Sequence, residues 1–243
     1  MNPYDAQAVS EVLLNSIERG LSPNTLYLSR SEKALYLGRL GKKSNVNMEY
    51  CEGEGIPVIR NHLGKSEAVL DEDCLLITLI AEKSSINQNV EDLLMCIANG
   101  LNTMGLKTEV KGNDIMSDKK VAGMSFELVG DLIAFDGVAL IDFDYDFCEM
   151  ALKPMPEKFI NKKASNHREY LTTIKAELDR HVETSEVVSA IQSGFEDGLQ
   201  VVFEVSNSLT DEENQMLEGL SEKYHSEQWI NTGRWSPVKD YGL

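Results

Sequence analysis

The stretch Lys111-Gly-Asn-Asp-Ile-Met-Ser-Asp-Lys-Lys-Val-Ala-Gly-Met-Ser-Phe-Glu-Leu128 predicts two strands joined by a tight turn at residues 117–119. Side chains alternate between the faces of a strand, so the second strand is predicted to carry Lys120 on the same face as an apolar stripe. The stripe consists of Ala122, Met124, Phe126 and Leu128. An unpaired buried ammonium is costly, so Lys120 needs an anion: an Asp of the fold, or a phosphate or carboxylate of a ligand. Spacing alone favours a structural lysine, since strand lysines often protect sheet edges.

The composition excludes several classes of function. The chain has 243 residues and a formal net charge of -17, which argues against a protein that binds nucleic acid or an anionic membrane. The four cysteines and four histidines are scattered, without a Cys-x-x-Cys pair, and predict neither a zinc site nor a disulfide framework. We see no signal peptide and no apolar run near 18 residues, and therefore expect a cytoplasmic protein.

Hydrophobic periodicity predicts an α+β fold, in which helices pack on one side of a largely antiparallel sheet. The predicted helices cover residues 4–17, 45–51, 90–101, 147–152, 185–196 and 210–224, the last opening with a capping box at Thr210 and Glu213. Besides the two strands above, the predicted strands are 25–30 and 34–38, joined as a hairpin, then 56–60, a strand from 68, 75–80, 132–143 and 199–205. No linker rich in Pro, Gly or Ser is visible. Residues 1–243 are therefore predicted to form one domain, with 185–243 packed back on it.

The segment from 157 to 170 is unusually basic for this chain. It contains Lys158, Lys162, Lys163 and Arg168 within eleven residues. We interpret it as a solvated loop, the usual place for such a cluster of charges.

Several segments resemble the lipoate–protein ligase family. Asn113-Asp114-Ile115, followed by Lys120-Val121-Ala122-Gly123, is similar to that family's Asn-Asp-(Ile/Leu)…Lys-(Val/Ile)-(Ser/Ala)-Gly signature. The strand ending at Arg60, the segment 135–140 and the closing Tyr224…Trp229 also match in order. The resemblance covers about residues 4–230. It implies a class II biotin/lipoate-ligase-like catalytic domain, without the additional C-terminal domain of longer members.

The resemblance implies an enzyme that uses ATP and Mg²⁺ to activate lipoate, or a similar acyl acid, as acyl-AMP. The acyl group would then pass to the lysine of a lipoyl-domain acceptor protein. For a short form, the resemblance also implies a separate small accessory-domain protein as a partner. Lys120 would contact the acyl carbonyl and the α-phosphate. Asn113 and Asp114 would hold Mg²⁺ and phosphate oxygens, and Arg60 would lie near the phosphates or the acyl chain. The other residues expected to contact the nucleotide or acyl ligand are Gly64, Lys65, Ser66, Ala68, Val69, Ala122, Gly123, Asp136 and Gly137.

Two positions depart from the family pattern. Gly64-Lys65-Ser66-Glu67 stands where the family has three glycines, so side chains replace backbone donors, and Glu67 would repel phosphate. An ordinary surface loop is the simpler interpretation of this segment. Asp136 stands where the family has His, which removes a donor and adds a negative charge.

Three alternatives to the ligase remain open. An acyl-carrier-dependent lipoyl or octanoyl transferase needs a thiol. The position of Pro154 and Met155, where related transferases carry a cysteine, offers none, and Cys148 is the nearest candidate. A non-catalytic relative that binds a lipoyl domain or an acyl ligand would explain the lost glycines and His. Biotin ligation is weaker, because the Gly-Arg-Gly-Arg biotin loop is absent.

Overall fold

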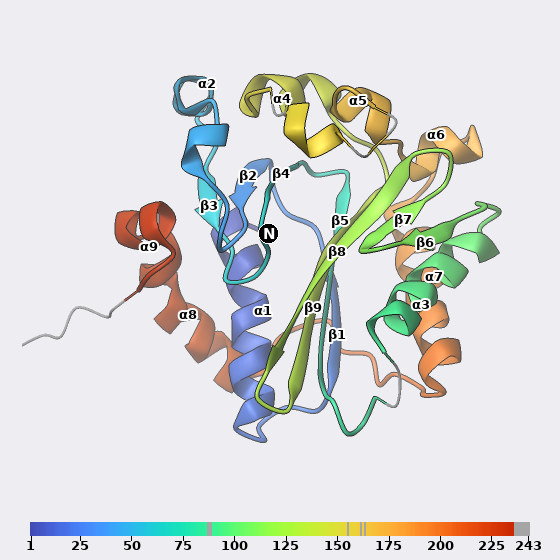
Figure 1. The fold of residues 1–243 in the computed structure, drawn as a ribbon. Helices are drawn as coiled ribbons and strands as arrows, with labels where there is room; N and C mark the ends of the chain where they lie inside the picture. The colour runs from blue at the N-terminus through green and yellow to red at the C-terminus, as the bar shows by residue number, and fades with distance from the viewer. Residues whose placement is uncertain (87–88, 155, 161, 163, 236–243) are drawn as a thin grey trace, which may run out of the picture.

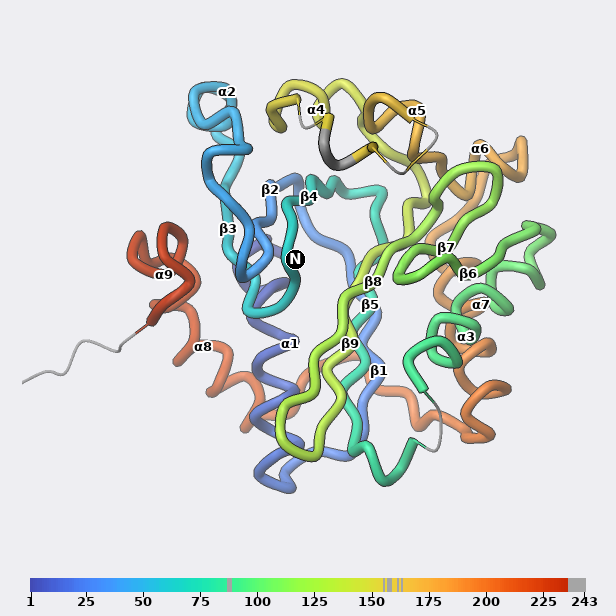
Figure 2. The backbone as a smooth tube through the Cα atoms, in the orientation of Figure 1, coloured from blue at the N-terminus to red at the C-terminus, as the bar shows by residue number. Residues whose placement is uncertain are grey.

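The predicted α+β fold is confirmed. The computed structural model describes residues 1–86, 89–154, 156–160, 162 and 164–235, and Figures 1 and 2 show how its elements are arranged. One sheet has six strands in the order β1-β5-β9-β8-β7-β6, and every neighbouring pair in it is antiparallel. A smaller sheet has the order β3-β2-β4, with β2 and β3 parallel.

The strands are β1 (Thr25–Ser29), β2 (Ala34–Leu37), β3 (Val58–Arg60), β4 (Glu67–Leu70), β5 (Cys74–Glu82), β6 (Glu109–Lys111), β7 (Asp114–Met116), β8 (Lys120–Val129) and β9 (Leu132–Leu140). The helices are α1 (Pro3–Glu18), α2 (Met48–Gly53), α3 (Val90–Thr103), α4 (Tyr145–Ala151), α5 (His167–Tyr170), α6 (Ile174–Leu178), α7 (Thr184–Leu199), α8 (Asp211–His225) and α9 (Glu227–Thr232). Two short 3₁₀ turns cover Lys43–Asn45 and Pro156–Phe159. Within the described residues, no helix is long and apolar enough to cross a membrane.

The two faces of the six-stranded sheet have different environments, and β5 shows why. Its odd-numbered residues, such as Ile77, belong to the apolar core that α3 and α7 cover. Its even-numbered residues Leu76 and Thr78 face a cavity instead. The helix α1 and the smaller sheet lie on that second side, as Figure 1 shows. Strand alternation therefore separates a filled core from an open site.

The predicted hairpin of residues 25–38 is wrong, because its two strands belong to different sheets. The strand β1 pairs with β5, whereas β2 pairs with β3 and β4. The turn residues permit a hairpin here, but the pairing of a strand depends on its packing in the rest of the fold. Because the chain crosses from one sheet to the other, the cavity lies between β2 and β5, with Tyr36 and Leu76 in its walls.

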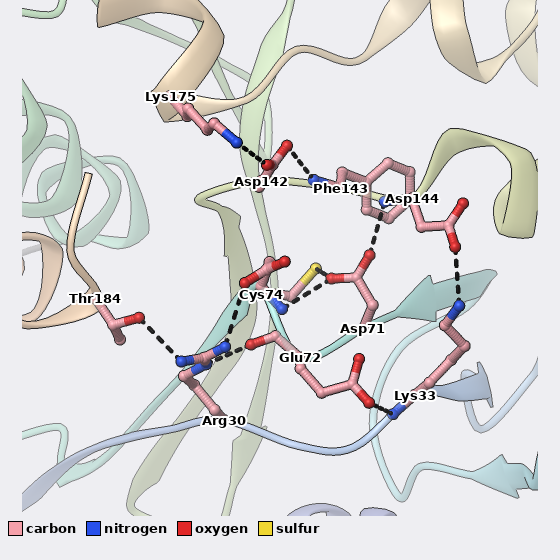
Figure 3. A network of polar contacts seen from close by, with 11 residues as sticks. Arg30, Lys33, Asp71, Glu72, Cys74, Asp142, Phe143, Asp144, Lys175 and Thr184 are labelled. Carbon is pink, nitrogen blue, oxygen red and sulfur yellow. Dashed lines mark hydrogen bonds and ion pairs between the residues drawn. The ribbon is translucent and has the colours of Figure 1, made fainter. Parts of the chain in front are cut away.

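A polar network fixes this crossing segment (Figure 3). Arg30 donates to Thr184 Oγ1 at 3.2 Å and pairs with Asp73 Oδ1 at 3.3 Å. Lys33 pairs with Asp144 Oδ2 at 2.8 Å. The network surrounds a small acidic hollow of about 300 Å³. Two of its cations, Arg30 and Lys33, come from the crossing segment and a third, Lys175, from α6, so we assign the network to holding the two sheets together.

The predicted strand at residues 199–205 is also wrong. The helix α7 continues to Leu199 and ends at Gln200, whose φ of 57° is left-handed. The residues that follow are irregular, and Val202 and Val205 are 92% and 70% exposed. β-branched residues favour strands, but propensity does not supply a hydrogen-bonding neighbour. By contrast, the capping box of Thr210 and Glu213 at the start of α8 is confirmed.

Candidate functional site

A cavity of about 1010 Å³ opens between the two sheets. Strands β4, β5, β8 and β9 line it together with α1, the loop 61–66 and residues 162–171. Most of the residues predicted to contact the nucleotide or acyl ligand lie around it: Gly64, Lys65, Ser66, Ala68, Val69, Asn113, Asp114, Lys120, Gly123, Asp136 and Gly137. Arg60 and Ala122 are not among its lining residues. The structure thus brings together residues that are far apart in the chain.

A bulge turns Lys120 toward this cavity. The register between β7 and β8 shifts, so that Ile115 pairs with Ala122 but Met116 pairs with Lys120. Ala122 is buried in the core beneath α3. A Cβ atom on Gly123, which points to the face opposite Ala122, would overlap the Lys120 ammonium. The prediction that Lys120 shares a face with Ala122 is therefore wrong, because the extra residue of a bulge reverses the alternation.

Two ammonium groups and a phenol surround the carboxylate of Asp114. Lys120 Nζ lies 2.7 Å from Asp114 Oδ1, and the two side chains are 23% and 21% exposed. Lys162 Nζ lies 3.7 Å from Asp114 Oδ2, to which the Tyr170 hydroxyl donates a hydrogen bond at 2.5 Å. The Lys162 ammonium also lies 3.9 Å from the centre of the Tyr170 ring. We call these four residues the cation end of the cavity.

The electrostatics of the cation end follow from this arrangement. Burial raises the pKa of Asp114, but Lys120, Tyr170 and Lys162 outweigh burial, so the pKa lies below its ordinary value. Burial lowers the pKa of Lys162, and Asp114 partly opposes this effect. Burial and the Asp114 carboxylate both raise the pKa of Tyr170, which keeps its hydroxyl protonated as a donor. Asp114 therefore stays charged and holds two ammonium groups at the cation end of a cavity that polar and apolar residues line together.

Lys162 and Tyr170 are site residues that the sequence interpretation missed. We expected the segment from 157 to 170 to be a solvated loop, whereas Lys162, Tyr170 and Leu171 line the cavity. An isolated bridge between Lys120 and Leu171 joins this segment to β8. The only signal was the excess of basic residues itself, which does not say which lysine turns inward. Lys163 lies outside the described residues.

The loop that replaces the family's glycines lines the cavity and is not an ordinary surface loop. Gly64 has a left-handed φ of 82°, and its backbone packs against Gly38, where a Cβ would come within 2.7 Å of the Gly64 carbonyl carbon. Lys65 and Ser66 are exposed at the cavity wall. Glu67 is buried and accepts a hydrogen bond from the Lys42 backbone N–H at 2.6 Å. Its carboxylate is thus held by the neighbouring segment, although Glu67 still lines the cavity.

Arg60 has a structural position rather than the expected place beside a ligand. It is 3% exposed, and its Nη1 donates to the backbone carbonyls of Gly38, Arg39 and Gly41 at 2.9 to 3.0 Å. Its Nε donates to the Ile230 carbonyl at 2.8 Å. Because its Nε and Nη1 donate to backbone carbonyls on both sides, Arg60 joins α9 to the segment after β2. Ala122 is likewise a core residue and not a lining residue.

The opposite part of the cavity carries a buried carboxylate. Asp136 is 9% exposed and lines the cavity from β9. Ser10 Oγ of α1 donates to its Oδ2, and Thr78 Oγ1 of β5 donates to its Oδ1, both at 2.6 Å. Glu127 of β8 also lines the cavity. We call Asp136, Glu127, Ser10 and Thr78 the carboxylate end; the sequence interpretation identified Asp136 but neither of its donors.

The predicted Mg²⁺ ligands do not form a preformed metal site. Both Asp114 oxygens already interact, one with Lys120 and the other with Tyr170 and Lys162. Asn113 lines the cavity beside it. Among the described residues, no group of three or more His, Cys, Asp or Glu side chains could hold a metal ion. Asp114 in this arrangement is a counter-ion for lysines, and we assign no step to Mg²⁺.

Comparison with known proteins gives the family context. A family model described as the lipoyl protein ligase A/B catalytic domain matches residues 2–196. Octanoyltransferase LipM of Brevibacillus brevis is 23% identical to this chain in an alignment 262 positions long. The alignment covers 94% of this chain and 95% of that protein. Lipoate-protein ligase A subunit 1 of Thermoplasma acidophilum is 24% identical over 237 residues, which cover 91% of this chain and 89% of that protein.

Solved structures with the same fold agree with this result. A bi-partite lipoate protein ligase from Thermoplasma acidophilum, solved with its E2 lipoyl domain, has a TM-score of 0.82 at 21% identity, over 98% of this chain and 97% of that chain. A lipoate-protein ligase A bound with ATP has a TM-score of 0.81 at 20% identity, over 96% of each chain. At these identities the likeness establishes the fold alone. The family model, which spans most of the sequence, shows that this chain belongs to the lipoyl protein ligase A/B catalytic-domain family.

Proposed function

We propose that this protein is an ATP-dependent lipoate–protein ligase. It activates lipoate, or a similar acyl acid, as acyl-AMP and transfers the acyl group to the lysine of a lipoyl-domain acceptor protein. The observation that carries this proposal is the Lys120 ammonium, which lies at the end of a large cavity beside a second ammonium from Lys162. Two cations around one carboxylate form a place where an acyl phosphate anhydride can bind.

The chemistry needs fixed positive charge at two moments. When the acid's carboxylate attacks the α-phosphorus of ATP, pyrophosphate leaves and negative charge develops on the phosphate oxygens. When the acceptor amine attacks the acyl carbonyl, charge develops on the carbonyl oxygen and AMP leaves. We assign to Lys120 the role of opposing both charges. Its ion pair with Asp114 supports this assignment, because it fixes the ammonium in position before a ligand arrives. Lys162 adds a second charge from another segment of the chain.

The partners of the reaction are proposed by analogy with the relatives. The Thermoplasma acidophilum ligase is described as bi-partite, and this chain covers 97% of the length of its solved chain. This supports a separate small accessory protein for the adenylation step, besides the lipoyl-domain acceptor. The four cysteines are buried and form no disulfide, which supports a reducing compartment such as the cytoplasm.

The test is an incubation of the purified protein with ATP, Mg²⁺, lipoate and a lipoyl-domain acceptor, followed by intact-mass measurement of the acceptor. We expect the acceptor to gain the mass of one lipoyl group. Lys120→Ala should abolish the gain, whereas Lys111→Ala, a matched change at an exposed lysine of β6, should leave it unchanged. No mass gain, with or without a candidate accessory protein, would contradict the proposal.

A second candidate is an acyl transferase that works through a thioester on Cys148. This thiol is 1% exposed but lines the same cavity, and an octanoyltransferase is among the similar proteins. The position of Pro154 and Met155 still offers no thiol, and Met155 lies outside the described residues. Incubation with an octanoylated acyl carrier protein, with Cys148→Ser as the variant and buried Cys51→Ser as the control, separates the two functions. An octanoyl adduct that depends on Cys148 would favour the transferase.

A further inference from the structure

The carboxylate end of the cavity holds a charge that no ion pair among the described residues balances. Asp136 is nine-tenths buried, and none of the ion pairs among the described residues includes it. Lys65 lines the same cavity, but its exposed ammonium is in no ion pair with this carboxylate. Burying a charge is costly unless it is paired and hydrogen-bonded. Within the part of the chain that the structure describes, the hydroxyl donors of Ser10 and Thr78 are thus the only compensation for this carboxylate.

The hydrogen bonds of Asp136 leave acceptor capacity unused. An ionised carboxylate offers about four lone-pair positions. Ser10 and Thr78 each donate one hydrogen bond, both at 2.6 Å, and each uses a different oxygen. These two bonds fix the orientation of the carboxylate against α1 and β5. About two acceptor positions therefore remain for a donor that enters the cavity.

A second carboxylate makes this end of the cavity acidic as a whole. Ser125 pairs directly with Asp136 across β8 and β9, and Gly123 pairs with Val138. Because alternate residues of a strand share a face, Gly123, Ser125 and Glu127 follow one another along the cavity side of β8. All three line the cavity. The cavity side of β8 thus carries a positive charge at one end, from the Lys120 ammonium above Gly123, and a negative charge at the other, from the Glu127 carboxylate.

One ligand can reach both ends. The Lys120 ammonium lies over Gly123, and Asp136 faces Ser125 two residues further along β8. Two residues of an antiparallel strand span about 7 Å, and the step from β8 to β9 adds about 5 Å sideways, so the two positions lie about 8 Å apart. This separation matches an acid of medium chain length, with its carboxylate at Lys120 and its other end beside Asp136. A wholly apolar end group would leave the buried carboxylate facing hydrocarbon.

On the basis of the proposed function, we propose that the acid activated here carries a hydrogen-bond donor at the end remote from its carboxylate. The donor is an amine, a hydroxyl or an amide N–H, and it binds the free acceptor positions of Asp136. Lys120 and Lys162 recognise the acid group, and Asp136 selects the remote group. Lipoate and octanoate, which lack such a donor, are then poorer ligands than acids that carry one.

The test compares acids that differ only at the remote end. Equilibrium binding by calorimetry is measured for octanoic, 8-hydroxyoctanoic and 8-aminooctanoic acids, and for the matching six-carbon series, with lipoic acid as a further competitor. We expect at least one donor-bearing acid to bind about tenfold more tightly than its unsubstituted partner and than lipoate, the equivalent of about 1.4 kcal/mol. Asp136→Asn keeps the size and one acceptor oxygen, and should reduce the preference for the amine most strongly.

Each outcome decides the inference. Equal binding of substituted and unsubstituted acids by the native protein contradicts it, as does the absence of binding by any donor-bearing acid. If Asp136→Asn loses thermal stability but keeps the preference, Asp136 only ties α1 to the sheet and the inference is wrong. Acyl-AMP formation, measured with the same acids, tests the proposed function separately. Donor-dependent binding without acyl-AMP, with or without a candidate accessory protein, would leave the binding preference standing and overturn the ligase. Acyl-AMP formed equally from all the acids would support the ligase and overturn the preference.

Discussion

The two ends of the cavity bury charge in different ways. At the cation end, Asp114 pairs with Lys120 and Lys162 and also accepts a hydrogen bond from Tyr170. At the carboxylate end, Asp136 has two hydroxyl donors and no cationic partner among the described residues. The first end holds two ammonium groups around one carboxylate and keeps an excess of positive charge. The second end holds a carboxylate with hydroxyl donors alone, so under the two proposals above the first end binds the acid group and the second selects its remote end.

Among the changes that test this difference between the two ends, Gly123→Ala is expected to cause the largest loss of activity. The added Cβ would overlap the Lys120 ammonium, the far end of a flexible side chain, and would displace it from Asp114. Displacing a catalytic group by about 1 Å can reduce a rate about 100-fold. We therefore expect about a 100-fold loss in acyl-transfer rate with little change in melting temperature. A variant with full activity would show that the position of Lys120 is unimportant.

Gly137→Ala, next to Asp136, should affect stability instead. Here the new Cβ would run into the Met124 side chain and the Gly123 carbonyl, which are packed and cannot move freely. Overpacking of this kind costs about 1–3 kcal/mol. Denaturant unfolding measures the loss, with Gly219→Ala of α8 as the control, because nothing lies near that Cβ position. Unchanged stability would mean that the sheet between the two ends is less tightly packed than it appears.

Lys162→Ala should have a smaller effect on activity than loss of Lys120. Its ammonium is 3.7 Å from Asp114, compared with 2.7 Å for Lys120, and its side chain is more exposed, at 32% against 23%. We expect about a tenfold loss in acyl-AMP formation, or about 1.4 kcal/mol in the barrier. Single-turnover rates at low and high salt measure it, with Lys111→Ala as the control. A loss equal to that of Lys120→Ala would show that the two lysines act as a unit.

The smallest expected effect is a dependence of stability on pH that comes from the buried His62. Burial lowers the pKa of His62 below its ordinary value of 6.5, although Asp136 and Glu11 partly oppose this. Near pH 6.5 the His62 imidazole therefore binds a proton more readily in the unfolded chain than in the folded chain. Stability should fall as the pH is lowered below this value, by at most about 1.4 kcal/mol per pH unit from this residue.

Melting temperatures between pH 7.5 and pH 5 test this prediction. His62→Gln should flatten the dependence, whereas His181→Gln, at a site where the side chain is 77% exposed, should retain it. If His62→Gln keeps the native slope, the loss of stability comes from other groups.

The sequence predicted the parts of the site that depend on local order. Asn113, Asp114 and Lys120 are close in the chain, so one local signature identifies all three, and all three line the cavity. Strand alternation alone gave the wrong face for Lys120, because the bulge opposite Met116 comes from the pairing of β7 with β8. In the same way, the position of Lys162 depends on how the segment after α4 returns over β8.

The fold was predictable to a similar degree. Helix boundaries followed from periodicity and caps, as the box at Thr210 shows. The hairpin and the strand at residues 199–205 failed because both needed information about neighbours. The strand β1 pairs with β5 at the edge of the larger sheet, and the valines after Gln200 lie in an irregular, exposed segment. Strand propensity is a property of one segment, whereas strand pairing also requires a second segment as the partner.

The most direct measurement is the affinity for a hydrolysis-resistant acyl-sulfamoyl adenosine, a mimic of acyl-AMP. It should be determined by calorimetry for the native protein, Lys120→Ala and Lys111→Ala. If Lys120 holds the anhydride, the first variant should bind about 100-fold more weakly and remain folded, while the second should match the native protein. Equal affinity in all three proteins would contradict the assignment of Lys120 to the ligand and leave it a structural partner of Asp114 alone.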